Sequence, residues 1–142
     1  MILVSISRLR VRSWRHLPMF LIQAVRSSLQ AKSAEGNLSV SILKEARNTF
    51  WTRTVWTNEK AMKTYIVSGV HKQAMHSLLE WCNEAAVVYW EQEAAQPPSW
   101  EEAYRRLKKE GRPSKVNHPS DDHQAYQFST PRVRLTGVLH FK

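Results

Sequence analysis

Apolar and polar side chains alternate along several stretches of the chain, and this pattern predicts β-strands. The stretches are residues 2–11, 38–42, 49–56 and 85–91. The last of them is almost continuously apolar, which is typical of a strand buried on both faces. The link between the second and third, residues 46–48, is so short that these two strands are expected to pair as an antiparallel hairpin.

Apolar residues at helical spacing predict helices between these strands. The first begins near Pro18, whose missing N–H is not needed in a first turn, and ends at Gly36. The second is capped by Asn58 and ends before Gly69, which suits a left-handed cap. A further helical piece follows over residues 70–82. Its predicted inner stripe consists of His71, Met75, Leu78, Leu79 and Cys82.

The order over residues 1–93 is strand, helix, strand, strand, helix, strand. This is the ferredoxin-like βαββαβ arrangement of an α+β protein, with an antiparallel sheet and the helices on one face. Rows of serine alternate with apolar residues on the strands, so the other face of the sheet also needs a cover. A second copy of the sheet would supply it, and we therefore predict a homodimer, a dimeric α/β barrel.

Residues 94–142 are expected to form a C-terminal extension packed on the same domain. Ser99 and Glu102 have the spacing of a capping box and predict a helix. Residues 112–131 are polar and contain three prolines, which predicts a surface loop. Residues 132–142 alternate again and predict an added strand, on the sheet edge or on the dimer partner.

Length and composition narrow the class of protein. With 142 residues, of which 42% are hydrophobic and 23% charged, the chain has the size and composition of one globular domain. No apolar run approaches the roughly 20 residues of a membrane span. The single cysteine excludes an intramolecular disulfide. We expect a cytoplasmic protein without membrane contact.

The net charge of +9 is concentrated in two basic blocks. Six basic residues lie between Arg8 and Lys32, with no acid before Glu35. The second block comprises Arg105, Arg106, Lys108, Lys109, Arg112 and Lys115. The simplest interpretation is a solvated basic surface, and the alternative is contact with an anionic ligand, an acidic partner or nucleic acid. Nucleic acid is the weaker alternative, because the aromatic residues follow the core pattern instead of alternating with basic residues.

His71 is the candidate catalytic residue. It lies at the start of a helix, beside a glycine and on the stripe predicted to face the sheet. A helix N-terminus disfavours an imidazolium, so a neutral histidine is expected, suited to act as a base, a ligand or a hydrogen-bond donor. The alternative is a histidine at the edge of the core whose ring bonds a backbone carbonyl.

The aromatic residues of the strands are candidates for the walls of a ligand pocket. On the strand at residues 49–56, alternation places Trp56 on one face and Trp51 and Arg53 on the other. We predict substrate-binding roles for Trp51, Trp56 and Tyr89, together with Met75 on the inner helical stripe. The alternative is that these residues belong to the core or to a dimer interface. Arg53 interrupts an apolar strand and is a further candidate, because a buried arginine needs an anionic partner.

The anionic partner of Arg53 is expected to be Glu45, Glu91 or a ligand carboxylate. Cys82 is interpreted as a small core residue instead of a nucleophile, because no basic group lies near it. Residues 118–123 contain metal-type side chains at a spacing unlike that of known sites, so no metal is predicted.

The segments FWTRTVW, NEKAMKTYIVSGVHKQAMHSLLEW and AAVVYW together resemble the dimeric α/β-barrel superfamily that includes antibiotic-biosynthesis monooxygenases. The signature is carried by Trp56, Met62, Ser68, Gly69, His71, Ala74 and Met75. The resemblance covers about residues 2–93 and is strongest with uncharacterised bacterial members. It implies a ferredoxin-like dimer with a pocket between sheet and helices. Some members oxidise quinol-type substrates without a cofactor, and others degrade haem with a helical histidine as ligand.

Three hypotheses follow. The first is a monooxygenase-like protein that binds an aromatic or hydrophobic small molecule and oxidises it without a cofactor, with His71 as base. The second is a non-catalytic interaction module with a basic surface. The third is a haem-binding protein. Matching Ser68 to the serine of the haem-degrading pattern places the ligand position on Met75, a departure that argues against haem.

Overall fold

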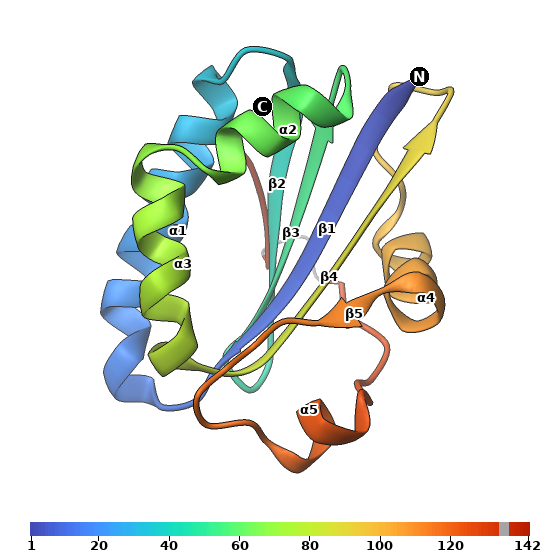
Figure 1. Ribbon diagram of the computed structural model, residues 1–142. Coiled ribbons are helices and arrows are strands. Elements are labelled where there is room, and N and C mark those ends of the chain that lie inside the picture. Colours follow the sequence, from blue (N-terminus) through green and yellow to red (C-terminus); the bar gives the residue numbers. More distant parts are fainter. Residues whose placement is uncertain (134–136) are drawn as a thin grey trace.

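A six-stranded antiparallel sheet forms the centre of the protein, as the computed structural model shows (Figure 1). The structure describes residues 1–133 and 137–142, and the side chains of Val70 and His71 lie outside this description. The strands are β1 (Ile2–Val11), β2 (Asn37–Glu45), β3 (Thr49–Trp56), β4 (Cys82–Gln92), β5 (Arg112–Pro113) and β6 (Val138–His140). Their order is β5-β4-β1-β3-β2-β6. The four central strands have the predicted ferredoxin-like order, which confirms the fold class.

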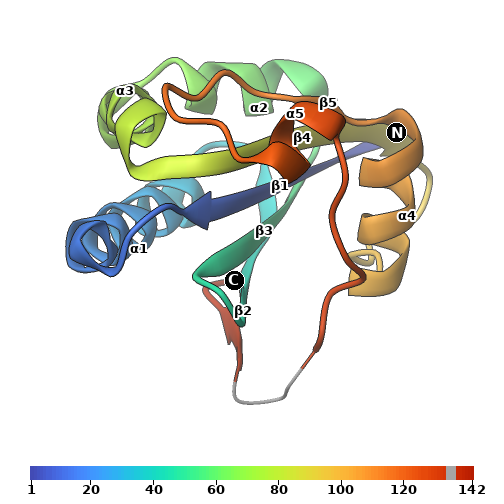
Figure 2. The same cartoon turned by 90° about the horizontal axis from the view of Figure 1, so that it is seen from below.

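Helices cover both faces of this sheet (Figures 1 and 2). On one face lie α1 (Leu17–Ser33), α2 (Glu59–Ile66) and α3 (Gly69–Trp81), and a short 3-10 turn (Trp14–His16) precedes α1. On the opposite face lies α4 (Trp100–Glu110). A short helix, α5 (Asp121–Ala125), contacts β4. None of the described helices has the length and apolar character needed to cross a bilayer.

Local sequence signals account for where these elements begin and turn. Asn58 accepts a hydrogen bond from the N–H of Ala61 at 2.8 Å, and Ser99 accepts one from Glu102 at 3.1 Å, so both predicted N-caps are confirmed. Gly36 has a φ of 86°, and a β-carbon there would lie 2.6 Å from that of Ala61. The turn at Gly36 therefore requires glycine for both conformation and space.

The alternation along β3 divides its side chains between two separate cores. Phe50 packs near Phe20 of α1, with ring centroids 4.8 Å apart, and Trp56 packs on Tyr65 of α2 at 5.2 Å. Trp51 and Val55 point to the opposite face and belong to the cluster beneath α4. The predicted division of the β3 side chains between two faces is thus confirmed.

The second face of the sheet is covered by the C-terminal extension. Trp100, Ala103 and Leu107 of α4 are buried against apolar residues of β1 and β4, such as Ile6 and Val88. The need for a cover, from which the homodimer was inferred, is therefore met over this part of the sheet within one chain. The homodimer itself, and the division at residue 93, stay predictions that light scattering and limited proteolysis would test.

The extension contains more regular structure than its composition predicts. The expected loop at residues 112–131 includes β5, which pairs with β4, and α5. The strand predicted for residues 132–142 is described only as β6, which adds to β2 at the sheet edge, the first of the two predicted places. The part of that prediction at residues 134–136 lies outside the described residues.

The predicted inner stripe of α3 is confirmed at Leu78 and at Cys82, just after the helix, and differs at Met75. Ala74 is buried and Leu78 packs toward the core, whereas Met75 is 47% exposed. The spacing was correct, but periodicity alone leaves an uncertainty of one residue in which side is inward. The prediction that Met75 faces the core is wrong.

Candidate functional site

A small apolar cavity lies between the sheet and helices α1, α2 and α3. Its volume is about 90 Å³. Apolar side chains dominate its walls, and serine and threonine hydroxyls from both layers are interspersed. The lining residues are Ser7, Leu9, Phe20, Gln23, Ala24, Ser27, Ser28, Ala31, Val40, Ile42, Phe50, Thr52, Thr54, Tyr65, Ala74 and Leu78. We call this the helix-side cavity.

A buried polar atom of the helix-side cavity lacks a hydrogen bond to the described residues. The Oε1 of Gln23 is buried and has no hydrogen-bond partner among the described residues. Two nearby groups are satisfied: Tyr65 donates its hydroxyl to the carbonyl of Ser27 at 2.9 Å, and Trp56 donates its Nε1–H to Thr54 at 2.9 Å. Because a buried acceptor without a donor is unfavourable, a ligand hydroxyl that donates to Gln23 would remove this penalty.

The size of the helix-side cavity limits its ligands. Pockets for drug-sized molecules have volumes of about 300–1,000 Å³. A volume of about 90 Å³ therefore suits a single ring or a short aliphatic chain. It does not accommodate haem, which is much larger than a single ring. A polycyclic substrate would require the helices to move apart.

The structure does not bring the predicted site residues together. Trp56 lies on the helix side of the sheet, packed against Tyr65, whereas Trp51 lies on the face beneath α4. Trp51 donates its Nε1–H to Glu45. Tyr89 is 40% exposed. The side chain of His71 lies outside the described residues, so its catalytic role stays a prediction.

Arg53 is buried, as predicted, and the protein groups that it bonds are neutral, in place of the expected Glu45 or Glu91. Its Nη1 donates to the carbonyl of Pro98 at 2.7 Å, and its guanidinium carbon lies 4.3 Å from the ring centroid of Trp100. In the described part of the chain no carboxylate forms an ion pair with it. Burial lowers the pKa of this guanidinium. Arg53 thus anchors the segment that leads into α4.

Sequence reasoning missed Gln23 and Tyr65 as cavity residues. Gln23 lies on the first predicted helix and Tyr65 on the second, and no sequence pattern assigned a ligand-binding role to either. Only the packing of α1 against α2 shows that Tyr65 reaches Ser27, which lies 38 residues earlier. A polar residue beside an inner helical stripe is the signal that would have indicated such a position.

Cys82 is a core residue, as predicted. It is fully buried, and burial raises the pKa of its thiol to about 12. The described residues contain no group of three or more His, Cys, Asp and Glu side chains arranged to hold a metal ion. In the segment 118–123, His118 bonds Glu80 at 3.3 Å, and His123 accepts from the N–H of Ala85 at 3.2 Å.

The second basic block is partly neutralised on the surface of α4. Arg106 pairs with both Glu102 and Glu110, at 3.7 and 3.3 Å, and its guanidinium carbon lies 4.8 Å from the ring centroid of Trp90. These i,i+4 pairs reduce the positive field that an acidic partner would meet. The interaction-module hypothesis is therefore weaker than the sequence suggested.

The fold is that of ferredoxin-like proteins related to antibiotic-biosynthesis monooxygenases. A candidate antibiotic biosynthesis monooxygenase from Nitrosomonas europaea is 16% identical, with a TM-score of 0.58 over 64% of this chain and 89% of that one. SnoaB, a cofactor-independent oxygenase from Streptomyces nogalater, is 14% identical, with a TM-score of 0.56 over 68% and 98%. Rv0793 from Mycobacterium tuberculosis is 11% identical, with a TM-score of 0.59 over 66% and 97%.

The chain belongs to the family described as a domain of unknown function (DUF3291), whose match covers residues 22–131. This match begins within α1, so it leaves out β1, and it includes the rest of the ferredoxin-like core and most of the C-terminal extension. A search of curated proteins gives no match to the chain. Because the sequence identities are low, the structural similarities define the fold and do not identify a ligand.

Proposed function

We propose that this protein binds a small phenol-like molecule in the helix-side cavity and oxidises it without a cofactor. The observation that carries the proposal is an apolar cavity with one unpartnered buried acceptor, Gln23 Oε1. A single aromatic ring would occupy the apolar volume, and its hydroxyl would donate to Gln23. The cofactor-independent oxygenase SnoaB, which shares the fold, supports the choice of chemistry.

Filling the helix-side cavity should abolish ligand binding. Ala24 lines the cavity, whereas its neighbour Val25 is exposed on the outer surface of α1. We expect Ala24→Leu to eliminate the binding of p-cresol measured by isothermal titration calorimetry, because leucine occupies the volume that the ring needs. The matched control is Val25→Leu, which adds a methylene group to the same helix outside the cavity and should leave binding unchanged. Equal binding to both variants would contradict the proposal.

Gln23 should decide the preference for a hydroxyl. In the natural chain p-cresol is expected to bind about tenfold more tightly than toluene, because a hydrogen bond to a buried acceptor contributes about 1–1.5 kcal/mol. Gln23→Leu should remove this preference while both compounds still bind. A preference that survives the substitution would assign the hydroxyl to another partner.

His71 is proposed as the base of the oxidation. A deprotonated phenol is electron-rich and reacts with oxygen more readily than the neutral form, and a positioned base contributes about 10²–10⁴-fold to such a proton transfer. We expect His71→Ala to lower ligand-dependent oxygen uptake by at least about 10²-fold while p-cresol binding is retained. Oxygen uptake that is unchanged in this variant would remove His71 from the mechanism and leave the binding proposal intact.

A further inference from the structure

A second and larger cleft lies on the sheet face opposite the helix-side cavity. Its volume is about 730 Å³, within the range of small-molecule pockets. β1 presents Val4 and Ile6 beneath α4, and further along the same face it presents Arg8 and Arg10. The cleft begins at these arginines, where the face changes from apolar to basic, and the segment 127–132 forms part of its wall.

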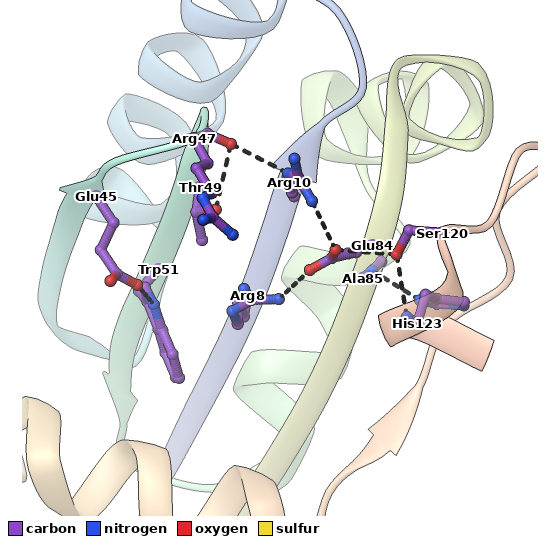
Figure 3. Close-up of polar contacts among 10 residues, drawn as sticks. All are labelled: Arg8, Arg10, Glu45, Arg47, Thr49, Trp51, Glu84, Ala85, Ser120 and His123. Atoms are coloured by element: carbon purple, nitrogen blue, oxygen red, sulfur yellow. Dashed lines mark hydrogen bonds and ion pairs between the residues drawn. The ribbon is translucent and has the colours of Figure 1, made fainter. Parts of the chain in front are cut away.

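Arg8 is held in a fixed position in this cleft. It is 8% exposed, and its Nη1 donates to Glu84 of β4 at 2.7 Å. Its guanidinium carbon lies 5.2 Å from the ring centroid of Phe128, so the aromatic ring packs over the cation. Arg10 reaches the other oxygen of Glu84 at 3.1 Å (Figure 3). Two cations thus share one carboxylate.

The protein leaves most of the guanidinium donors of the cleft unused. A guanidinium carries five N–H donors. Within the described residues, protein acceptors bond one nitrogen of Arg8, two of Arg10 and none of Arg47. The Nε of Arg8 is buried without a hydrogen-bond partner there. The cleft therefore has donors in excess.

The carboxylates of the cleft do not balance these donors. Glu84 also accepts from the hydroxyl of Ser120 at 2.9 Å, and Glu45 accepts from Trp51 and from the N–H of Arg132 (Figure 3 shows the first two of these contacts). Asp122 also lines the cleft but is exposed to water, where its charge is screened. The cleft is thus lined by four arginines and three acids, and two of the acids, Glu84 and Glu45, already accept hydrogen bonds from the protein. The arginines are Arg8, Arg10, Arg47 and Arg132.

The hairpin turn places Arg47 at this cleft. Arg47 has a φ of 61°, and its carbonyl accepts from the Nε of Arg10 at 3.2 Å and from the hydroxyl of Thr49 at 3.5 Å (Figure 3). These bonds tie the turn to the end of β1. The guanidinium of Arg47 makes no hydrogen bond to a described acceptor, and both Arg47 and Thr49 line the cleft.

We propose that this arginine cleft binds the oxyanion group of a small organic molecule, a phosphate ester or a carboxylate. Guanidinium groups recognise both headgroups through paired N–H donors, and the bonds are strengthened by charge. The hydroxyls of Ser129 and Thr130 supply further donors. The site lies on the other side of the sheet from the helix-side cavity, so it is independent of the oxidation proposed above.

Calorimetric titration of the full chain with glycerol 3-phosphate tests this proposal, with propanoate as carboxylate and glycerol as neutral control. We expect saturable binding of at least one anion, weakened by salt, and no binding of glycerol. Preference for phosphate or for carboxylate would identify the headgroup of the natural ligand. The absence of saturable binding for both anions would overturn the proposal.

Arg47→Asn is the discriminating variant, because asparagine tolerates the positive φ and removes the charge. It should weaken anion binding by at least about tenfold. The matched control is Arg26→Gln, which removes one charge from the exposed surface of α1 and should change binding less than twofold. Equal losses in both variants would indicate a bulk charge effect and refute the site. If Arg47→Asn lowers the melting temperature, Arg132→Gln replaces it with the same expectation.

Discussion

Replacing Glu84 by alanine is expected to lower the free energy of unfolding by about 3–5 kcal/mol. Glu84 is only 3% exposed, and it accepts from Arg8, Arg10 and Ser120. Without it, Arg8 keeps a buried positive charge with no counter-ion, because the described residues offer no second carboxylate within reach of Arg8. Urea unfolding followed by circular dichroism measures the loss.

Glu80→Ala is the matched control for this prediction. Glu80 also bonds an arginine just after the end of β1 and a residue of the extension, Arg12 at 3.2 Å and His118 at 3.3 Å. It differs in being exposed to solvent, where ion pairs contribute about 0–1 kcal/mol. Similar losses of unfolding free energy in the two variants would contradict the prediction, because they would show that burial does not increase the contribution of Glu84 to stability.

The carboxyl of Glu84 should also make the free energy of unfolding depend on pH. Burial by itself would raise the pKa of Glu84, but hydrogen bonds from Arg8, Ser120 and Arg10 and the charge of Arg8 outweigh it and hold the pKa below its usual range. The stabilisation is therefore complete above the unfolded pKa of about 4.3 and is lost as the pH falls through the lower, folded value. Glu84→Ala should flatten this acid limb, and an unchanged acid limb would assign it to other groups.

Leu107→Ala should destabilise the protein by about 2–5 kcal/mol. Leu107 is fully buried between α4 and the sheet, in the cluster that includes Trp51 and Trp100. The substitution leaves a cavity in a well-packed core while the helix itself keeps a strong helix former. The shift of the urea midpoint at constant slope measures the effect.

Lys109→Ala on the same helix is the control, because Lys109 is exposed and the change should alter stability by no more than about 0.5 kcal/mol. Equal, small effects of both substitutions would mean that α4 does not cover the sheet in solution. Light scattering of Leu107→Ala adds a second readout, since a loosened α4 would expose apolar strand residues and promote association.

Patterns local in the sequence predicted much of this fold. Strand alternation and the caps at Asn58 and Ser99 depend on neighbours a few residues away. The same patterns assigned Trp51 and Trp56 to opposite faces of β3, because a strand has a period of two. The resemblance to antibiotic-biosynthesis monooxygenases predicted a ferredoxin-like fold, and the structural comparisons support this fold.

The candidate sites depend on contacts that no local pattern specifies. Arg8 meets Glu84 across 76 residues of sequence, and Tyr65 meets Ser27 across 38. One residue of rotation in α3 exchanged Met75 for Ala74 on the inner side, since helical periodicity gives the spacing of a stripe more firmly than its direction. Trp51 and Trp56, both predicted as pocket walls, lie on opposite faces of β3 and therefore do not line one pocket.

The sequence by itself determined the order of the elements, their caps and the two faces of each strand, because these follow from backbone geometry and the alternation of side chains. Only the tertiary structure decided that α4 covers the second face, that Arg53 bonds a carbonyl in place of a carboxylate, and that two separate cavities flank one sheet. Those outcomes depend on how segments distant in sequence pack together to bury apolar area, and local sequence patterns do not specify that packing.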